Sequence, residues 1–134
     1  GFDAKRPTEL VQAEILERQA ASHWIIEGVF GELVALALDR VELLIWLDLD
    51  WAACRASLLT RGFTYSTEDE RLRLTAAFER LLTWAEAYQT RTDLRSHSGH
   101  ARLYVNFSRR KLHFSTRADV DALLSTLHPP PVSS

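Results

Sequence analysis

Residues 41–49, VELLIWLDL, decide the fold of this chain. From Leu43 to Leu47 every residue is apolar, and the next charge is Asp48. A short run that is apolar on both faces is typical of a strand buried in a parallel sheet. Residues 23–28, HWIIEG, contain a second apolar run, which ends in the acid Glu27 and the glycine Gly28. We therefore predict parallel strands over 23–28 and 41–49.

Helical patterns alternate with these strands. We expect helices over residues 8–21, 32–40, 51–61, 68–92 and 117–128, and a third strand over 111–115. Asp50 and Thr116 are expected to cap the helices that follow them. Residues 93–100 are expected to form a loop, and periodicity leaves 101–107 open between strand and helix. The alternation predicts an α/β fold, in which helices cover both faces of a parallel sheet.

Length and composition limit the class of protein. The chain has 134 residues, 46% of them apolar and 25% charged, which suits one soluble domain. A net charge of −2 gives no reason to expect binding to nucleic acid or to anionic membranes. The single cysteine, Cys54, excludes an internal disulfide. There is no apolar run long enough to span a bilayer and no signal-peptide pattern at residues 1–10, so we expect a cytoplasmic protein.

The carboxylates at the two strand ends are the first candidate site. Ligands of open α/β sheets bind at the carboxyl ends of strands, so Glu27, Gly28 and Asp48 are expected at the functional edge. Two carboxylates there could hold Mg²⁺ through water or act as a base. The alternative is structural: Asp48 and Asp50 could serve only as helix caps, while Glu27 is a poor cap.

Arginines form the second candidate set. Arg61 and Arg91 are expected near loops on the same edge as Glu27, where a guanidinium could bind phosphate oxygens through paired donors. Three further arginines on the long helix are expected to be solvated and paired with nearby acids; they are Arg71, Arg73 and Arg80. The five histidines show no metal-ligand spacing, and Cys54 is expected to be an inert thiol. No glycine-rich phosphate-loop motif occurs in the chain.

Several of these stretches, taken in order, resemble the adenylate-kinase-like P-loop kinases. They are WIIEGVFG, LLIWLDLDWAACRASLLTRG, LLTWAEAYQTR and GHARLYVNFSRRKLHFST. Within this family, the stretches resemble small bacterial proteins of the topology modulation type and uncharacterised adenylate kinases. The resemblance covers nearly all of residues 22–127 and corresponds to the C-terminal three-quarters of such a kinase. Two departures stand out: Glu27 replaces an aspartate, and Phe30-Gly31 replaces a common Pro-Arg.

The resemblance implies a three-layer parallel sheet of the P-loop kinase type, whose first strands and phosphate loop are missing from this chain. It implies a single domain over 1–134, with a short lid at 62–68 and a flexible tail at 129–134. By resemblance, Glu27 and Gly28 help to hold Mg²⁺ through water, and Arg61 and Arg91 face phosphate groups.

The function implied by the resemblance is phosphoryl transfer. We expect a nucleotide or nucleoside kinase-like phosphotransferase that uses ATP and Mg²⁺ and acts on a nucleotide or a small phosphorylated substrate, or the larger part of such an enzyme. This chain alone is expected to be inactive unless the loop is supplied, and a partner chain could complete the sheet. The alternative is a non-catalytic kinase-like module that acts through a protein partner.

Overall fold

Two parallel strands form the sheet of this protein. In the computed structural model, which describes residues 7–128, β1 (Leu43–Leu47) pairs with β2 (Arg110–Phe114). One more backbone hydrogen bond, from the Asp48 N–H to the Phe114 carbonyl at 2.8 Å, continues the ladder past the end of β1. The strands predicted at 41–49 and 111–115 are confirmed. Residues 1–6 and 129–134, including the predicted tail, lie outside the described residues.

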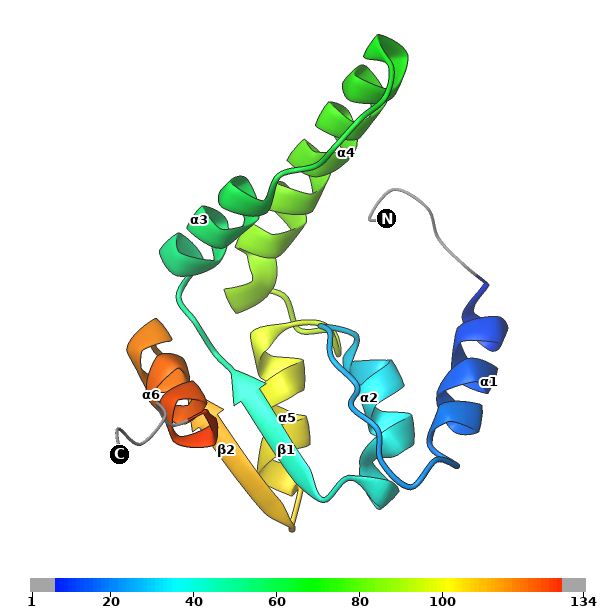
Figure 1. The fold of residues 1–134 in the computed structure, drawn as a ribbon, viewed down its shortest axis with the longest axis vertical. Coiled ribbons are helices and arrows are strands. Elements are labelled where there is room, and N and C mark those ends of the chain that lie inside the picture. The colour runs from blue at the N-terminus through cyan, green and yellow to red at the C-terminus, as the bar shows by residue number, and fades with distance from the viewer. Residues whose placement is uncertain (1–6, 129–134) are drawn as a thin grey trace, which may run out of the picture.

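Helices make up most of the remaining chain (Figure 1). In chain order they are α1 (Thr8–Arg18), α2 (Gly31–Ala37), η1 (Leu38–Arg40), α3 (Trp51–Arg61), α4 (Glu68–Glu86), η2 (Ala87–Gln89), α5 (His97–Asn106) and α6 (Arg117–Leu127). The long helix is shorter than predicted, because its last turn tightens into the 3₁₀ helix η2. Residues 101–107, which periodicity left open, belong mainly to α5, and α5 also takes the second half of the predicted loop at 93–100.

Side-chain caps begin four of these helices. Asp50 accepts a hydrogen bond from the Ala53 N–H at 2.8 Å, and Thr116 accepts one from the Asp119 N–H at 3.1 Å, as predicted. Thr67 and Ser96 cap α4 and α5 in the same way. These oxygens satisfy amides that have no partner within their helices.

Helices lie on both sides of the two-strand sheet. In Figure 1, α5 passes behind β1 and α6 lies in front of β2. Trp46 is on the α5 side, where its ring is 5.7 Å from that of Tyr104. The predicted α/β class is thus confirmed in a coarser form, as a mostly helical structure with a small two-strand parallel sheet.

The predicted strand at 23–28 is wrong for the structure described. Residues 24–27 are coil, and Ile25 is 94% exposed. A strand needs a neighbour to bond its amides and carbonyls, and no strand among residues 7–128 pairs with this segment. The run is therefore coil, with Ile25 in solvent and Trp24 and Ile26 half-buried.

One edge of β1 pairs with no strand among residues 7–128, because the sheet has only the order β1–β2. Alternate side chains of β1 are also open to solvent: Leu43 is 38% exposed, Ile45 42% and Leu47 55%. The expectation that helices cover both faces of the sheet is therefore wrong at β1. An exposed, apolar edge strand is a surface on which another strand can pair.

Helices α3 and α4 form a long hairpin that extends away from the sheet (Figure 1). The apolar stripe predicted for α4 faces inward, with Leu74 and Ala77 buried. Residues 62–67 connect the two helices, and the short lid expected at 62–68 stays a prediction. No helix among residues 7–128 is long and apolar enough to cross a membrane.

Candidate functional site at the end of strand β1

Asp48 lies directly after β1 and holds two histidines from different elements. Its Oδ2 atom is 3.2 Å from Nε2 of His97, in the first turn of α5, and 3.0 Å from Nε2 of His113, on β2. The carboxylate is mostly buried, with 14% of its side chain exposed. Because an ionised carboxylate only accepts hydrogen bonds, both imidazoles present Nε2–H to Asp48. The sequence predicted a carboxylate here but not its partners.

Aromatic rings enclose this carboxylate–histidine group. Trp46 stacks on His113, with ring centroids 4.3 Å apart and planes 9° apart, and its centroid is 5.1 Å from that of His97. Tyr88 meets the edge of His97 at 5.8 Å. These contacts fix both imidazoles in orientation, which a hydrogen bond to one nitrogen does not achieve alone.

A directed chain of hydrogen bonds starts at the same tryptophan. The Trp46 Nε1–H donates to the Tyr88 hydroxyl at 3.2 Å, and this hydroxyl lies 2.9 Å from Nδ1 of His100. Nε2 of His100 is 3.0 Å from the Val29 carbonyl, which only accepts. His100 therefore carries its proton on Nε2, and the Tyr88 O–H donates to Nδ1. Burial raises the pKa of Tyr88, while the Trp46 hydrogen bond opposes this shift.

The chain of hydrogen bonds joins separate parts of the fold. It links β1 through η2 and α5 to Val29, one residue after Gly28. The loop after Glu27 is thus tied to the end of β1 by named contacts, although residues 24–27 form no strand.

An ion pair holds the beginning of α2 against the loop before α5. Arg95 Nε donates to Glu32 Oε1 at 2.5 Å, and its guanidinium lies 4.7 Å from the Phe30 ring centroid. The hydrogen bond from Arg95 lowers the pKa of Glu32. Backbone contact is also close, since a Cβ on Gly31 would lie 3.1 Å from the Leu94 carbonyl carbon.

Arg91 lies at the base of α4, among several acceptors. Its Nη1 donates to Asp93 at 2.9 Å and its Nη2 to the Arg95 carbonyl at 3.2 Å. The guanidinium carbon is 4.2 Å from the centroid of the Trp84 ring. Its Nε is buried and has no hydrogen-bond partner within residues 7–128.

The other predicted site residues lie apart from these contacts. Glu27 is exposed and has no hydrogen bond or ion pair within the described part of the chain. Gly28 has φ of 143°, a backbone conformation that favours glycine, and its expected part in holding Mg²⁺ stays a prediction. Arg61 is the exposed last residue of α3. No hydrogen bond or ion pair among residues 7–128 joins any two of the four residues Glu27, Asp48, Arg61 and Arg91.

The described residues contain no group of three or more histidine, cysteine or acidic side chains that could hold a metal ion. Mg²⁺ does not need one, because it keeps several waters and often binds through one or two carboxylates and the phosphates of a nucleotide. Glu27 is exposed and has no partner within residues 7–128, and its role in holding Mg²⁺ through water stays a prediction.

Sequence reasoning missed the histidines. All three histidines are far from Asp48 along the chain: they are His97, His100 and His113. Two of them also lie in the stretch 93–100, which was expected to be a loop. Sequence spacing therefore did not indicate that histidines meet Asp48. The register of β2 against β1 places His113 opposite Trp46, and helix α5 brings His97 to the same carboxylate. That register cannot be read from either strand alone.

Comparison of the chain with known protein families, with curated proteins and with solved structures finds no match.

Proposed function

We propose that this chain is the larger part of a nucleotide-kinase-like phosphotransferase that uses ATP and Mg²⁺. One observation carries the proposal: the free edge of β1. Figure 1 shows the coil before α2 running in the same direction as β1, with α5 behind the space between them. The kinases that the sequence resembles have a strand at this position, and their phosphate-binding loop follows it.

The residues at this end of the sheet suit such chemistry. Phosphoryl transfer depends on positioning and on charge neutralisation. Arg91, already held by Asp93 and Trp84, is oriented to offset phosphate charge. Glu27 would hold Mg²⁺ through water, and Mg²⁺ would neutralise the transferred phosphate. Arg61, on the protruding hairpin, would reach the phosphates if the hairpin closes.

The exposed apolar face of β1 favours a second candidate, a non-catalytic module that binds a protein partner. Three leucine or isoleucine side chains of β1 are at least 38% exposed, and an added strand from another protein would cover the open edge.

The test extends the chain. The protein is expressed with the sequence encoded immediately upstream of Gly1, and binding of ATP with Mg²⁺ is measured by titration calorimetry. We expect a G-x-x-x-x-G-K-[ST] motif within about 50 residues, magnesium-dependent binding by the extended protein and no binding by residues 1–134. Glu27→Gln should weaken the magnesium-dependent part of the ATP affinity. Glu42→Gln changes an exposed acid before β1 and should leave that affinity unchanged. An extended protein without ATP affinity would overturn the kinase proposal in favour of the binding module.

A further inference from the structure

Two imidazoles at the end of β1 each have one nitrogen that no described residue uses. Asp48 accepts the Nε2–H of His97 and of His113, so each ring keeps a lone pair on Nδ1. Within residues 7–128, neither Nδ1 atom has a hydrogen-bond partner. The two side chains are 34% and 36% exposed, so a molecule from solvent can reach them. A free nitrogen of an oriented imidazole is the group that most often removes a proton in general base catalysis.

Two other histidines show what this arrangement adds. Both ring nitrogens of His100 are occupied, one by the Tyr88 hydroxyl and one by the Val29 carbonyl, so this ring has no free base. His23 is exposed, its Nδ1 lies 3.1 Å from the Ser22 hydroxyl, and it forms no ion pair within residues 7–128. In that part of the chain, a carboxylate on one ring nitrogen and a free second nitrogen therefore occur together only at Asp48.

The carboxylate of Asp48 prepares these rings to act as bases. A carboxylate on one nitrogen fixes the tautomer in which the other nitrogen is unprotonated, and it stabilises the imidazolium that forms when that nitrogen takes a proton. His113 is the better held of the two rings, because Trp46 stacks on it with planes 9° apart. Its hydrogen bond to Asp48 is also the shorter, at 3.0 Å against 3.2 Å for His97. His113 is therefore better placed to act as a base, and His97 helps to hold the carboxylate.

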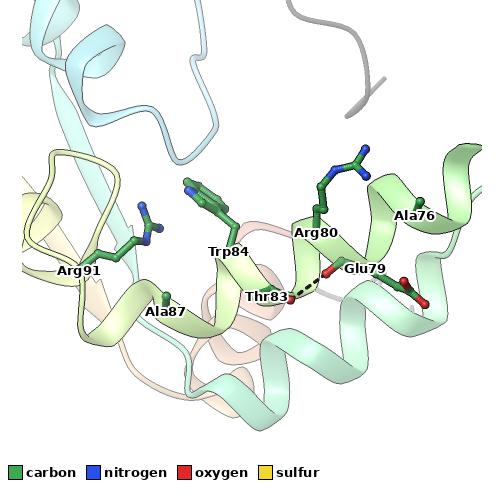
Figure 2. A pocket seen from close by; sticks show the side chains of 7 residues that line it. All are labelled: Ala76, Glu79, Arg80, Thr83, Trp84, Ala87 and Arg91. Atoms are coloured by element: carbon green, nitrogen blue, oxygen red, sulfur yellow. Dashed lines mark hydrogen bonds between the residues drawn. The ribbon is translucent and has the colours of Figure 1, made fainter.

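The charge at this group favours a neutral molecule as its substrate. No arginine or lysine of residues 7–128 forms a hydrogen bond or ion pair with Asp48 or with either histidine, so an anion there would meet the carboxylate charge. Arg80 was expected to pair with a nearby acid, and that expectation is wrong, because it has no ion pair within the described residues. Figure 2 shows that Arg80 extends to the same side of α4 as Trp84 and Arg91, so its positive charge lies along the hairpin.

We propose that His113 is the general base for the hydrolysis of small neutral carboxylic esters, with Asp48 as its positioning residue. Nδ1 takes a proton from a water molecule while the water oxygen forms a bond to the ester carbonyl carbon. The bond from that carbon to the alcohol oxygen then breaks, and the alcohol oxygen takes the proton from Nδ1. The products are the carboxylic acid and the alcohol, and the imidazole is neutral again. Between the two steps, Asp48 stabilises the imidazolium through its Nε2–H.

The test measures the hydrolysis of p-nitrophenyl acetate by residues 1–134 at about pH 8, at which imidazole side chains in general are neutral. His113→Gln keeps an N–H that can donate to Asp48 but has no basic nitrogen, and it should lower the rate at least about tenfold. His23→Gln is the matched control: it removes an exposed imidazole that has no carboxylate partner and should leave the rate unchanged. Circular dichroism checks that both variants are folded.

Two variants of Asp48 separate its charge from its part in folding. Asp48→Asn removes the charge that stabilises the imidazolium and should lower the rate about tenfold or more. Asp48→Glu keeps the charge and should restore part of that loss. Equal rates of the two variants would remove the positioning role of this carboxylate. Because a proton moves in the proposed step, hydrolysis by the unchanged chain should also be slower in D₂O than in H₂O.

A phosphate ester with the same leaving group tests the substrate class. We expect no hydrolysis of p-nitrophenyl phosphate, because it is an anion. The proposal fails if this phosphate is hydrolysed as fast as the acetate, if His113→Gln hydrolyses the acetate like the unchanged chain, or if the rate is the same in D₂O. It does not rest on the phosphotransferase function, whose test measures ATP binding and depends on neither histidine.

Discussion

The hydroxyl of Tyr88 donates to Nδ1 of His100 across 2.9 Å and so joins η2 to α5. The same hydroxyl accepts the indole N–H of Trp46. One oxygen therefore satisfies groups from two other elements, and its loss affects both.

Tyr88→Phe should destabilise the protein by about 1–2 kcal/mol, because the Trp46 N–H and Nδ1 of His100 both lose a partner in a half-buried site. Urea unfolding followed by circular dichroism measures the change. Tyr65→Phe is the control, since Tyr65 is 53% exposed and should change stability by less than about 0.5 kcal/mol. Equal effects of the two substitutions would argue against the network.

Asp48→Asn should cost about 1–3 kcal/mol, because the neutral amide oxygen accepts the hydrogen bonds of His97 and His113 more weakly than an anionic oxygen does. The ring orientation of His113 on Trp46 should loosen as well, which ring-current shifts in NMR spectra report. Asp39→Asn, at an exposed position in η1, provides the comparison and should be nearly neutral. If Asp48→Asn also left the stability unchanged, the hydrogen bonds between the two histidines and this carboxylate would contribute nothing to the stability of the protein.

Stability should depend on pH through Glu32. Arg95 lowers the folded-state pKa of this carboxyl below its ordinary 4.5. The stabilisation is therefore complete above the unfolded pKa and is lost as the pH falls through the lower, folded pKa. Both side chains are partly exposed, so Arg95→Gln should cost at most about 1 kcal/mol near pH 7.

The difference between Arg95→Gln and the unchanged chain should shrink as the pH falls below 4.5. Thermal unfolding at a series of pH values would show this. Arg55→Gln should give a curve parallel to that of the unchanged chain, and a loss from Arg95→Gln that is independent of pH would assign its role to packing on Phe30 instead.

Gly99→Ala should cost at least about 2 kcal/mol, because the new Cβ would lie 2.6 Å from Cα of Leu94 in a rigid loop. The loop carries Arg95, so the Glu32 ion pair should weaken with it. Val105→Ala on the same helix removes a side chain that is 71% exposed and should change stability by less than about 0.5 kcal/mol. Chemical denaturation of both variants makes the comparison.

Local chemistry predicted the elements whose formation depends on their own residues. The apolar run ending at Asp48, and the caps at Asp50 and Thr116, are confirmed in place. Each of these depends on contacts within a few residues, which a sequence displays directly.

Two features depend on residues far away in the sequence and could not be predicted in this way. Residues 24–27 have the composition of a buried strand, but a strand forms only if a neighbouring strand bonds it, and none does so among residues 7–128. His113 reaches Asp48 through the β1–β2 register and His97 reaches it through α5, which contacts β1, so both contacts join residues far apart in the sequence.

The hairpin of α3 and α4 places its connection, residues 62–67, at the end remote from the sheet (Figure 1). Insertions or deletions in that connection change how far the arm extends and leave the carboxylate and histidines at its base where they are. The length of the α3–α4 connection can therefore change without moving Asp48 or the histidines that contact it.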